Sequence, residues 1–253
     1  MRHIVNFSGG LDSTIGLIYV LENYAKYGDS QVFDIYSFYY KQTHAIELVA
    51  AKNIVNELEK KFNVKLNHTI VDLSNIVPNM RKDIGQIPYY TLRNMLFITL
   101  TAALGTAKNR MIGSTNLVYI FVNRTDAESG YADTTHEFIT DLKLTIKNYE
   151  KYGVNVGNLF IPYDRIEIIT PFIEKYKSEL IREYYDKYKD LLENSWSCYN
   201  PIVIQQDGKY YYIPCENCLA CKSRTVGKLI SVKQNHIVLD TDIETYLKQL
   251  LNS

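Results

Sequence analysis

The segment SGGLDS, from Ser8 to Ser13, constrains the fold of this chain more than any other stretch. A short apolar run, Arg2–Phe7, precedes it and an amphipathic stretch, Ser13–Tyr27, follows it, so the segment joins a predicted strand to a predicted helix. Glycines let a backbone approach an anion closely, successive N–H groups form an anion nest, and the helix N-terminus adds positive potential. The segment therefore predicts a phosphate-binding loop in an α/β domain.

Strand-like and helix-like segments alternate through the first half of the chain. Short apolar runs predict buried parallel strands at Arg2–Phe7, Asp34–Tyr39, Leu66–Val71 and Arg110–Ser114. Apolar residues at helical spacing predict helices at Ser13–Tyr27, His44–Phe62, Thr91–Lys108 and about His136–Tyr152. We therefore expect an open parallel sheet with helices on both faces.

The loops that follow these strands should gather at one edge of the sheet, because crossovers between parallel strands are right-handed. Ligands in open α/β sheets bind at that edge. We expect Ser8–Ser13, Tyr40–His44 and Ser114–Asp133 to face one crevice, and the irregular stretch Asn75–Tyr90 to cover it.

Composition and charge exclude several other classes of protein. The 253 residues carry 28 Lys and Arg against 28 Asp and Glu, and this neutral balance argues against a broad nucleic-acid or membrane surface. No stretch reaches the roughly 18 apolar residues of a spanning helix, and a strand begins too early for a signal peptide. We expect a cytoplasmic protein without direct nucleic-acid binding.

All four cysteines lie near the C-terminus, at Cys198, Cys215, Cys218 and Cys221. In a reducing compartment such a cluster indicates metal ligands before disulfides. Two Cys-x-x-Cys spacings share Cys218, so a short loop can offer three thiolates, with Cys198 as the fourth. A closed set of this kind is typical of structural zinc, and an iron–sulfur cluster is the main rival.

A β-hairpin is predicted between the first cysteine and the other three. Ile202–Gln206 and Lys209–Ile213 flank Asp207-Gly208, and Asp-Gly between β-prone runs is a strong signal for a two-residue turn. The tyrosines of the second run, 210–212, would either contact a partner or pack on the metal module.

The phosphate loop lacks the lysine of the common P-loop and resembles the PP-loop of the pyrophosphatase-type ATPases. That resemblance implies a fold of the adenine nucleotide alpha hydrolase type. It also implies that ATP is split between its α and β phosphates, with AMP transferred to the substrate.

Taken with the cysteines, the chain resembles the 7-cyano-7-deazaguanine synthase family over about residues 3 to 229. The resemblance is carried by SGGLDS, by WSCY with Cys-x-x-Cys-x-x-Cys-x-x-Arg, and by four segments between them. These four are YYKQTHAIELVAA (39–51), LRNMLFITLTAA (92–103), ESGYADTTHEFI (128–139) and TPFIEKYKSELI (170–181). We divide the chain into an ATPase and deazaguanine-binding domain (1–194), a zinc module with its hairpin (195–229) and an extension (230–253).

The resemblance implies that 7-carboxy-7-deazaguanine is adenylated with ATP and Mg²⁺, and that ammonia then gives the amide and finally the nitrile. It assigns catalysis to Asp12, Arg93 and Lys177. Nucleotide binding would use Ser8, Gly9, Gly10, Leu11, Asp12, Ser13, Thr14 and His44. The deazaguanine would contact Arg93, Asn94, Gly130, Tyr131 and Asp133, with Asp133 accepting from the N–H edge of the ring. Zinc would be structural, and a homodimer is expected.

The chain departs from the family pattern at several positions around the pocket. Thr91-Leu92 replaces Pro-Gly, Lys41 replaces a Gly, Thr134 replaces a Cys, and the stretch from Thr115 to Ala127 is unusually apolar. These changes leave three alternatives open. A relative from antiphage defence would couple the activated deazaguanine to an amine of a partner protein. A non-catalytic module would bind nucleotide only. A tRNA-modifying PP-loop enzyme would need a more basic surface.

Overall fold

The computed structural model describes residues 1–253 except 77–91, 109–114, 150–151, 163, 227–229 and 253. Five parallel strands form the central sheet, in the order β3-β2-β1-β4-β7. Their bounds are β1 Arg2–Asn6, β2 Val32–Tyr39, β3 Leu66–Asp72, β4 Thr115–Tyr119 and β7 Arg165–Ile169. The order reverses direction at β1, so β2 and β4 lie on either side of it and their loops diverge there.

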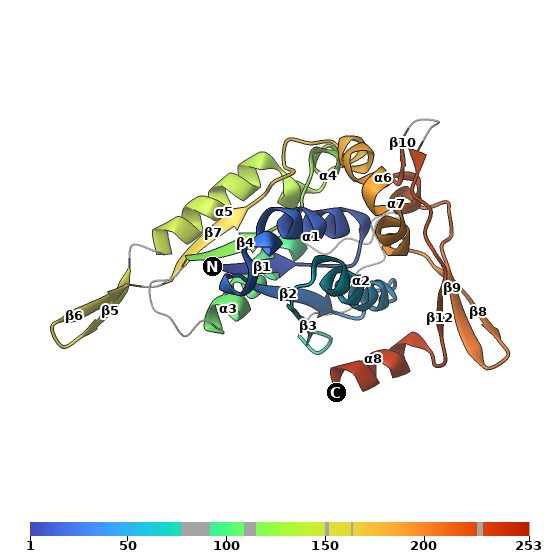
Figure 1. Cartoon of the computed structure of the whole chain (residues 1–253), viewed down its shortest axis with the longest axis horizontal. Helices are drawn as coiled ribbons and strands as arrows, with labels where there is room; N and C mark the ends of the chain where they lie inside the picture. The colour runs from blue at the N-terminus through green and yellow to red at the C-terminus, as the bar shows by residue number, and fades with distance from the viewer. Residues whose placement is uncertain (77–91, 109–114, 150–151, 163, 227–229, 253) are drawn as a thin grey trace.

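Helices cover both faces of this sheet, as predicted (Figure 1). One face carries α1 (Leu11–Tyr24), α2 (Glu47–Phe62) and α6 (Lys177–Asn194), and the other carries α3 (Arg93–Ala107) and α5 (His136–Tyr149). Successive strand residues point to opposite faces, so Val5 joins the core with α1 while Ile4 joins the core with α3. A short 3-10 helix, η1 (Ala25–Ser30), leads from α1 into β2.

The chain between β4 and β7 corrects one prediction. We expected a strand at 110–114, which lies outside the described residues, followed by a loop to Asp133. The structure instead forms β4 within that expected loop, because the apolar run TNLVY is a buried strand at the centre of the sheet. The short helices α4 (Arg124–Glu128) and η2 (Ala132–Thr134) follow it. The cover expected at Asn75–Tyr90 lies outside the described residues from residue 77 onward.

Several further elements of this region were not predicted. β7 completes the sheet at its edge, and α6 follows it after a turn at residues 171–175. A small antiparallel hairpin, β5 (Gly153–Val156) with β6 (Leu159–Pro162), projects from the far end of the molecule (Figure 1). None of the helices in the described residues has the length and apolar character needed to span a bilayer.

The hairpin predicted between the cysteines is confirmed as β8 (Ile202–Gln206) and β9 (Lys209–Ile213). Its turn residues Asp207 and Gly208 both have positive φ, 52° and 75°, as a type I′ turn requires. Tyr212 is buried and its hydroxyl accepts a hydrogen bond from the backbone N–H of Ile243 at 2.9 Å. At least this tyrosine therefore packs on its own chain.

The C-terminal segment completes this small sheet. β12 (Ile237–Leu239) pairs with β9 to give the order β12-β9-β8, and α8 (Ile243–Leu251) follows. The remaining elements are α7 (Leu219–Lys222), which holds part of the cysteine cluster, and the short pair β10 (Thr225–Val226) and β11 (Ile230–Ser231). The predicted boundary between the zinc module (195–229) and the extension (230–253) therefore falls between strands that pair with each other, β10 with β11 and β9 with β12.

Candidate functional site

A cavity of about 600 Å³ lies where the loops after β1, β2 and β4 meet the N-termini of α3 and α6. Its walls come from the predicted phosphate loop, from aromatic side chains of β2 and α3, and from the segments around the cysteines. The cavity therefore occupies the edge of the sheet at which we expected ligand to bind.

The phosphate loop has the tight backbone that its glycines predicted. Gly9 has a φ of 86°, and a Cβ at this position would lie 2.4 Å from the carbonyl oxygen of Glu47. The loop is held by hydrogen bonds from the Gly10 N–H to Ser8 Oγ (3.1 Å) and from Ser13 Oγ to the Gly10 carbonyl (3.0 Å). The predicted loop residues that line the cavity are Ser8, Gly10, Leu11, Asp12 and Ser13.

Two other predicted nucleotide-binding residues shape the loop from behind. Gly9 packs against α2, and Thr14 is fully buried with its Oγ1 donating to the Gly10 carbonyl at 2.8 Å. Neither is among the residues that line the cavity, so direct contact of either with nucleotide stays a prediction.

Asp12 and Lys177, each predicted to be catalytic, form an ion pair of 2.8 Å on the cavity wall. Burial alone would lower the pKa of Lys177, but the carboxylates of Asp12 and Asp126 outweigh it and raise that pKa, so Lys177 is charged. Asp12 Oδ1 is buried without a hydrogen-bond partner, which leaves this oxygen for a ligand.

Sequence reasoning missed Asp126, which completes this group. Burial and the Asp12 carboxylate raise the pKa of Asp126 to about 6, and the buried Asn123 donates to Asp126 Oδ2 at 2.9 Å. Asn123 is also the N-cap of α4, with its side chain accepting from the Asp126 N–H. An N-cap residue three positions before a carboxylate was the available signal.

The predicted deazaguanine residues divide between the cavity wall and its support. Arg93, Asn94 and Tyr131 line the cavity, whereas Gly130 and Asp133 do not. Both carboxylate oxygens of the buried Asp133 accept from Asn94, from its N–H at 2.9 Å and its Nδ2 at 3.1 Å. Asp133 therefore fixes the first turn of α3, and its predicted contact with a ring edge remains a prediction.

Two of the departures from the family pattern occupy left-handed backbone positions. Leu92, directly before α3, has a φ of 59°, and Lys41, in the loop after β2, has a φ of 56°. Glycine adopts this conformation without penalty, whereas other residues are strained there. The expected glycines thus have a backbone reason, and the chain keeps the conformation without them.

Aromatic rings form a flat part of the cavity wall. Phe38 of β2 and Phe97 of α3 stack with ring centroids 4.7 Å apart and an interplanar angle of 11°. The ring of Tyr40 lies 5.2 Å from that of Phe97. Phe38 was missed, because its place in a buried strand gave no sign that its ring reaches the cavity. A surface of this kind suits a planar heterocycle.

His44, predicted to lie near nucleotide, lines the cavity beside a buried carboxylate. Its Nε2 lies 3.5 Å from Glu47 Oε1. Burial and the Arg93 guanidinium lower the pKa of His44 to about 3, and burial raises the pKa of Glu47 to about 7. Glu47 belongs to the segment YYKQTHAIELVAA (39–51), but its residue type and position predicted no role for it.

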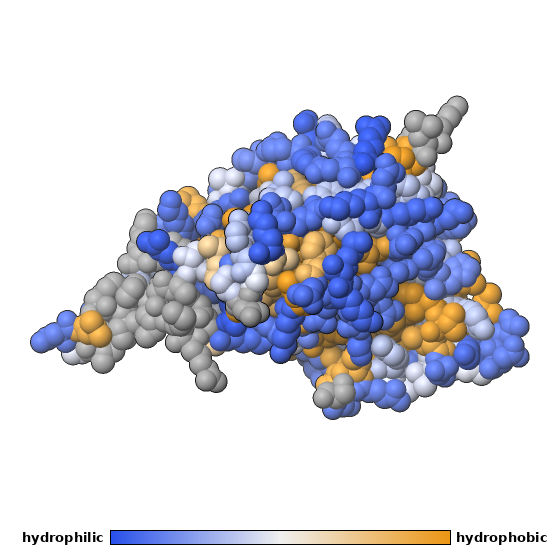
Figure 2. Space-filling model, in the orientation of Figure 1, coloured by the Kyte–Doolittle hydropathy of each residue, from blue (hydrophilic) through white to orange (hydrophobic). Residues whose placement is uncertain are grey.

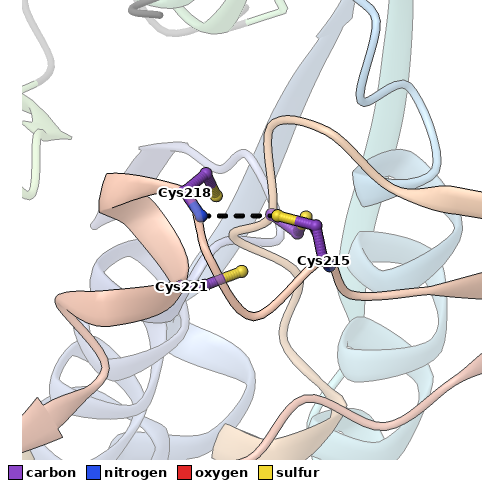
Figure 3. Close-up of side chains that lie close together, drawn as sticks. Cys215, Cys218 and Cys221 are labelled. Atoms are coloured by element: carbon purple, nitrogen blue, oxygen red, sulfur yellow. Dashed lines mark hydrogen bonds between the residues drawn. The ribbon is translucent and has the colours of Figure 1, made fainter.

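The four cysteines converge as predicted. Their sulfur atoms all lie within 4.8 Å of one another, and Cys198 and Cys218 are buried. Figure 3 shows Cys215, Cys218 and Cys221 directed toward one point from α7 and the loop before it. Backbone N–H groups of Cys215 and Cys218 donate to Cys198 Sγ (3.3 Å) and Cys215 Sγ (3.4 Å). Four convergent sulfurs with N–H donors around them fit a tetrahedral metal ion.

The cysteine segment also contacts the phosphate loop. The Trp196 N–H donates to the Gly9 carbonyl at 2.9 Å, and the Leu11 N–H lies 3.4 Å from its acceptor, Ser197 Oγ. The cysteine cluster is therefore tied to the loop through the residues directly before Cys198.

Comparisons with known proteins agree with this arrangement. The family model "Queuosine biosynthesis protein QueC" matches residues 2–230. The 7-cyano-7-deazaguanine synthase of Aliarcobacter butzleri is 31% identical over 236 residues, covering 89% of this chain and 90% of its own length. The synthase of Clostridium botulinum (strain 657 / Type Ba4) is 34% identical over 245 residues, covering 90% and 94%.

Among solved structures, the U34-tRNA thiolase NcsA from Methanococcus maripaludis with its [4Fe-4S] cluster matches with a TM-score of 0.43 and 12% identity. That match covers 78% of this chain and 58% of the thiolase. The family match over nearly the whole chain is the decisive comparison, and this chain belongs to the QueC family.

Proposed function

We propose that this chain is an ATP-dependent carbon–nitrogen ligase that adenylates 7-carboxy-7-deazaguanine and admits ammonia to form the amide and then 7-cyano-7-deazaguanine. One observation carries the proposal: a single cavity is lined both by the phosphate loop with Lys177 and by the aromatic wall with Arg93. Membership of the QueC family and the names of its relatives as 7-cyano-7-deazaguanine synthases support a deazaguanine substrate.

The phosphate loop and Lys177 would bind the departing pyrophosphate. Backbone N–H groups after Gly9 and the N-terminus of α1 attract anions, and the ammonium of Lys177 neutralises charge as the α–β bond breaks. The unpartnered Asp12 Oδ1 fits a Mg²⁺ ion that accompanies ATP, since Mg²⁺ binds few carboxylates together with phosphate oxygens.

The aromatic wall would bind the deazaguanine. Phe97 and Tyr131 offer ring faces and edges to a planar heterocycle, while Arg93 faces the carboxylate or the developing adenylate. Asp133 would act on the ligand through Asn94, whose side chain it orients.

Zinc would be held by the four cysteine thiolates and would supply a closed, structural crosslink. Its effect on the reaction would pass through Trp196 and Ser197, which hold the phosphate loop.

The test is incubation with ATP, Mg²⁺ and 7-carboxy-7-deazaguanine, with and without ammonium, followed by mass spectrometry of small molecules. We expect AMP and pyrophosphate release that depends on the acid, and nitrile only with ammonium. A matched control omits the acid. Absence of acid-dependent AMP release would refute the proposal and leave a nucleotide-binding module.

A protein acceptor is the second candidate, because the hairpin presents apolar side chains to solvent. Ile202, Val203 and Ile204 of β8 are 51%, 50% and 45% exposed. Figure 2 shows hydrophobic surface in the region of the small sheet to which β8 belongs. The predicted homodimer would also cover such a surface. Intact-protein mass spectrometry in the same experiment separates the outcomes, since a mass increase on a supplied partner would indicate a conjugate in place of free nitrile.

A further inference from the structure

The proposed reaction needs a proton acceptor, because ammonia exists largely as ammonium near neutral pH and ammonium has no free electron pair. The phosphate loop, Lys177 and Arg93 supply positive charge and take no proton. Glu47 lines the same cavity, and the roles proposed for the phosphate loop, Asp12, Lys177 and Arg93 leave this carboxylate unused. Its position in the cavity calls for another explanation.

Glu47 is held in place by the loop that follows β2. Gln42 Nε2 donates to Glu47 Oε1 at 3.1 Å and also to the Phe38 carbonyl at 3.1 Å, while Gln42 Oε1 accepts from the Tyr40 N–H at 2.9 Å. His44 Nε2 is the second neighbour of Oε1, at 3.5 Å. Both neighbours lie at Oε1, so Oε2 is the oxygen we assign to an incoming nitrogen.

His44 offers a second acceptor beside this carboxylate. Its Nδ1 is buried and has no hydrogen-bond partner among the described residues, although the side chain lines the cavity. The ring is neutral, because burial and Arg93 lower its pKa to about 3. With the proton on Nε2, directed at Glu47, the free pair on Nδ1 can accept one N–H of a small nitrogen donor.

The surrounding charges favour proton transfer at this point. Burial raises the pKa of Glu47 to about 7, although Gln42 and the Arg93 guanidinium partly oppose the rise. Tyr40 stays neutral, since burial raises its pKa to about 12 despite Arg93. An ammonium ion and a carboxylate both lose hydration in such a site, and proton transfer converts the two charged groups into two neutral ones.

We propose that Glu47 accepts the proton of the incoming ammonium ion, with His44 Nδ1 positioning the nitrogen, so that ammonia is generated inside the cavity. Ammonium gives one proton to Glu47, and the freed electron pair of nitrogen attacks the acyl carbon of the adenylate. The C–N bond forms, the bond from carbon to the AMP oxygen breaks, and that oxygen leaves with the electron pair. The added nitrogen then releases one proton to water to give the neutral amide, and Glu47 returns its proton to solvent.

This inference rests on the proposed function, and the experiment keeps the two apart by using two nucleophiles. Hydroxylamine is largely unprotonated at pH 7 and traps an acyl adenylate as a hydroxamate without needing a base. Ammonium needs one. Glu47→Gln keeps the shape of the side chain and its contact with Gln42, and Glu57→Gln, on the exposed face of the same helix, is the matched control.

We expect Glu47→Gln to lower ammonium-dependent product formation by about 10²-fold or more at pH 7, with hydroxamate formation reduced less than about threefold. Glu47→Asp should recover part of the ammonium-dependent rate, and Glu57→Gln should match the wild type. The dependence of the wild-type rate on a group titrating near pH 7 should be absent from Glu47→Gln.

Equal loss with both nucleophiles would overturn the inference, because it would place Glu47 in adenylation or in folding. Unchanged ammonium-dependent rates would overturn it as well. Wild-type protein that forms neither hydroxamate nor nitrile would refute the proposed function itself, and this inference with it.

Discussion

Replacing Arg224 with methionine should destabilise the whole protein, because one buried guanidinium joins the cysteine module to the α/β domain. Arg224 is 2% exposed and donates five hydrogen bonds. Its acceptors are the carbonyls of Leu192, Val232 and Lys233 and the hydroxyls of Ser195 and Ser197, at 2.7 to 3.0 Å. They come from the end of α6, from the segment before Cys198 and from the two residues directly after β11.

The magnitude follows from the acceptors that would lose their donor. The Leu192 carbonyl keeps a bond from Ser195 Oγ, so the buried carbonyl of Val232 carries most of the penalty and the partly buried carbonyl of Lys233 carries less. Each buried acceptor left without a partner costs about 1–3 kcal/mol. The variant no longer has to remove a guanidinium from water when it folds, and this offsets part of the loss. Methionine also retains most of the apolar packing of the stem. We estimate a loss of about 3 kcal/mol, which for a chain of this size lowers Tm by about 6–12 °C.

Thermal unfolding at fixed zinc concentration measures this loss. Arg182→Gln, at an exposed position of α6, is the control and should shift Tm by less than about 2 °C. Arg224→Lys should recover little, because an ammonium has three donors and lacks the planar fork. A Tm for Arg224→Met within 2 °C of the wild type would refute the reasoning, since it would show that water or relaxation satisfies these carbonyls.

Three further predictions concern the backbone, the buried carboxylate and the metal. Leu92→Gly should raise Tm by about 1–4 °C, because relief of the left-handed backbone strain at Leu92 exceeds the entropy that glycine adds to the unfolded chain. The control Leu144→Gly, within α5, should lower Tm. A lower Tm for Leu92→Gly would contradict the strain argument. Because burial raises the pKa of Glu47 to about 7, its protonated form stabilises the folded state fully below about pH 4.5, and this contribution is lost as pH rises through about 7. Between pH 4.5 and 7 the Tm of the wild type should therefore fall more steeply than the Tm of Glu47→Gln. Parallel curves for the two proteins would count against this prediction. Removing the metal with a chelator should lower Tm and raise the KM for ATP, because Trp196 and Ser197, next to Cys198, hold the phosphate loop. Adding zinc back should reverse both changes. An unchanged KM would show that the phosphate loop keeps its shape without the metal.

Sequence patterns predicted the elements that have a local cause. The glycines of the phosphate loop, the Asp207-Gly208 turn and the spacing of the cysteines each restrict backbone or ligand geometry within a few residues, and all three were found as predicted. The strand β4 lies within a stretch that was expected to be a loop, because sequence alone does not mark where pairing with a neighbour begins. Pairing with β1 and β7 fixes that point, and it depends on contacts distant in sequence.

Sequence patterns indicated those site residues whose type has one common role. They missed residues whose role depends on their neighbours in the fold. Asp133 was expected to bind ligand because a carboxylate suits a guanine-like edge; that contact stays a prediction, and the structure adds that Asp133 accepts two hydrogen bonds from Asn94 in the first turn of α3. Asp126 and Glu47 were given no role, and their altered pKa values arise from burial that no sequence pattern reports. A carboxylate in a motif can orient, bind or exchange protons, and only its surroundings distinguish these.

The phosphate loop is held both by the segment before Cys198 and by α2. The Gly9 carbonyl accepts from Trp196, and a Cβ at Gly9 would press on the backbone of Glu47 and Ala51, so the loop is fixed between the cysteine segment and α2. Glu47, which we propose accepts the proton of ammonium, is the first residue of α2. A change in the cysteine module therefore has a short structural route to both phosphate binding and proton transfer. Phosphate binding and proton transfer would then weaken together when the metal is lost, even though no cysteine lines the cavity.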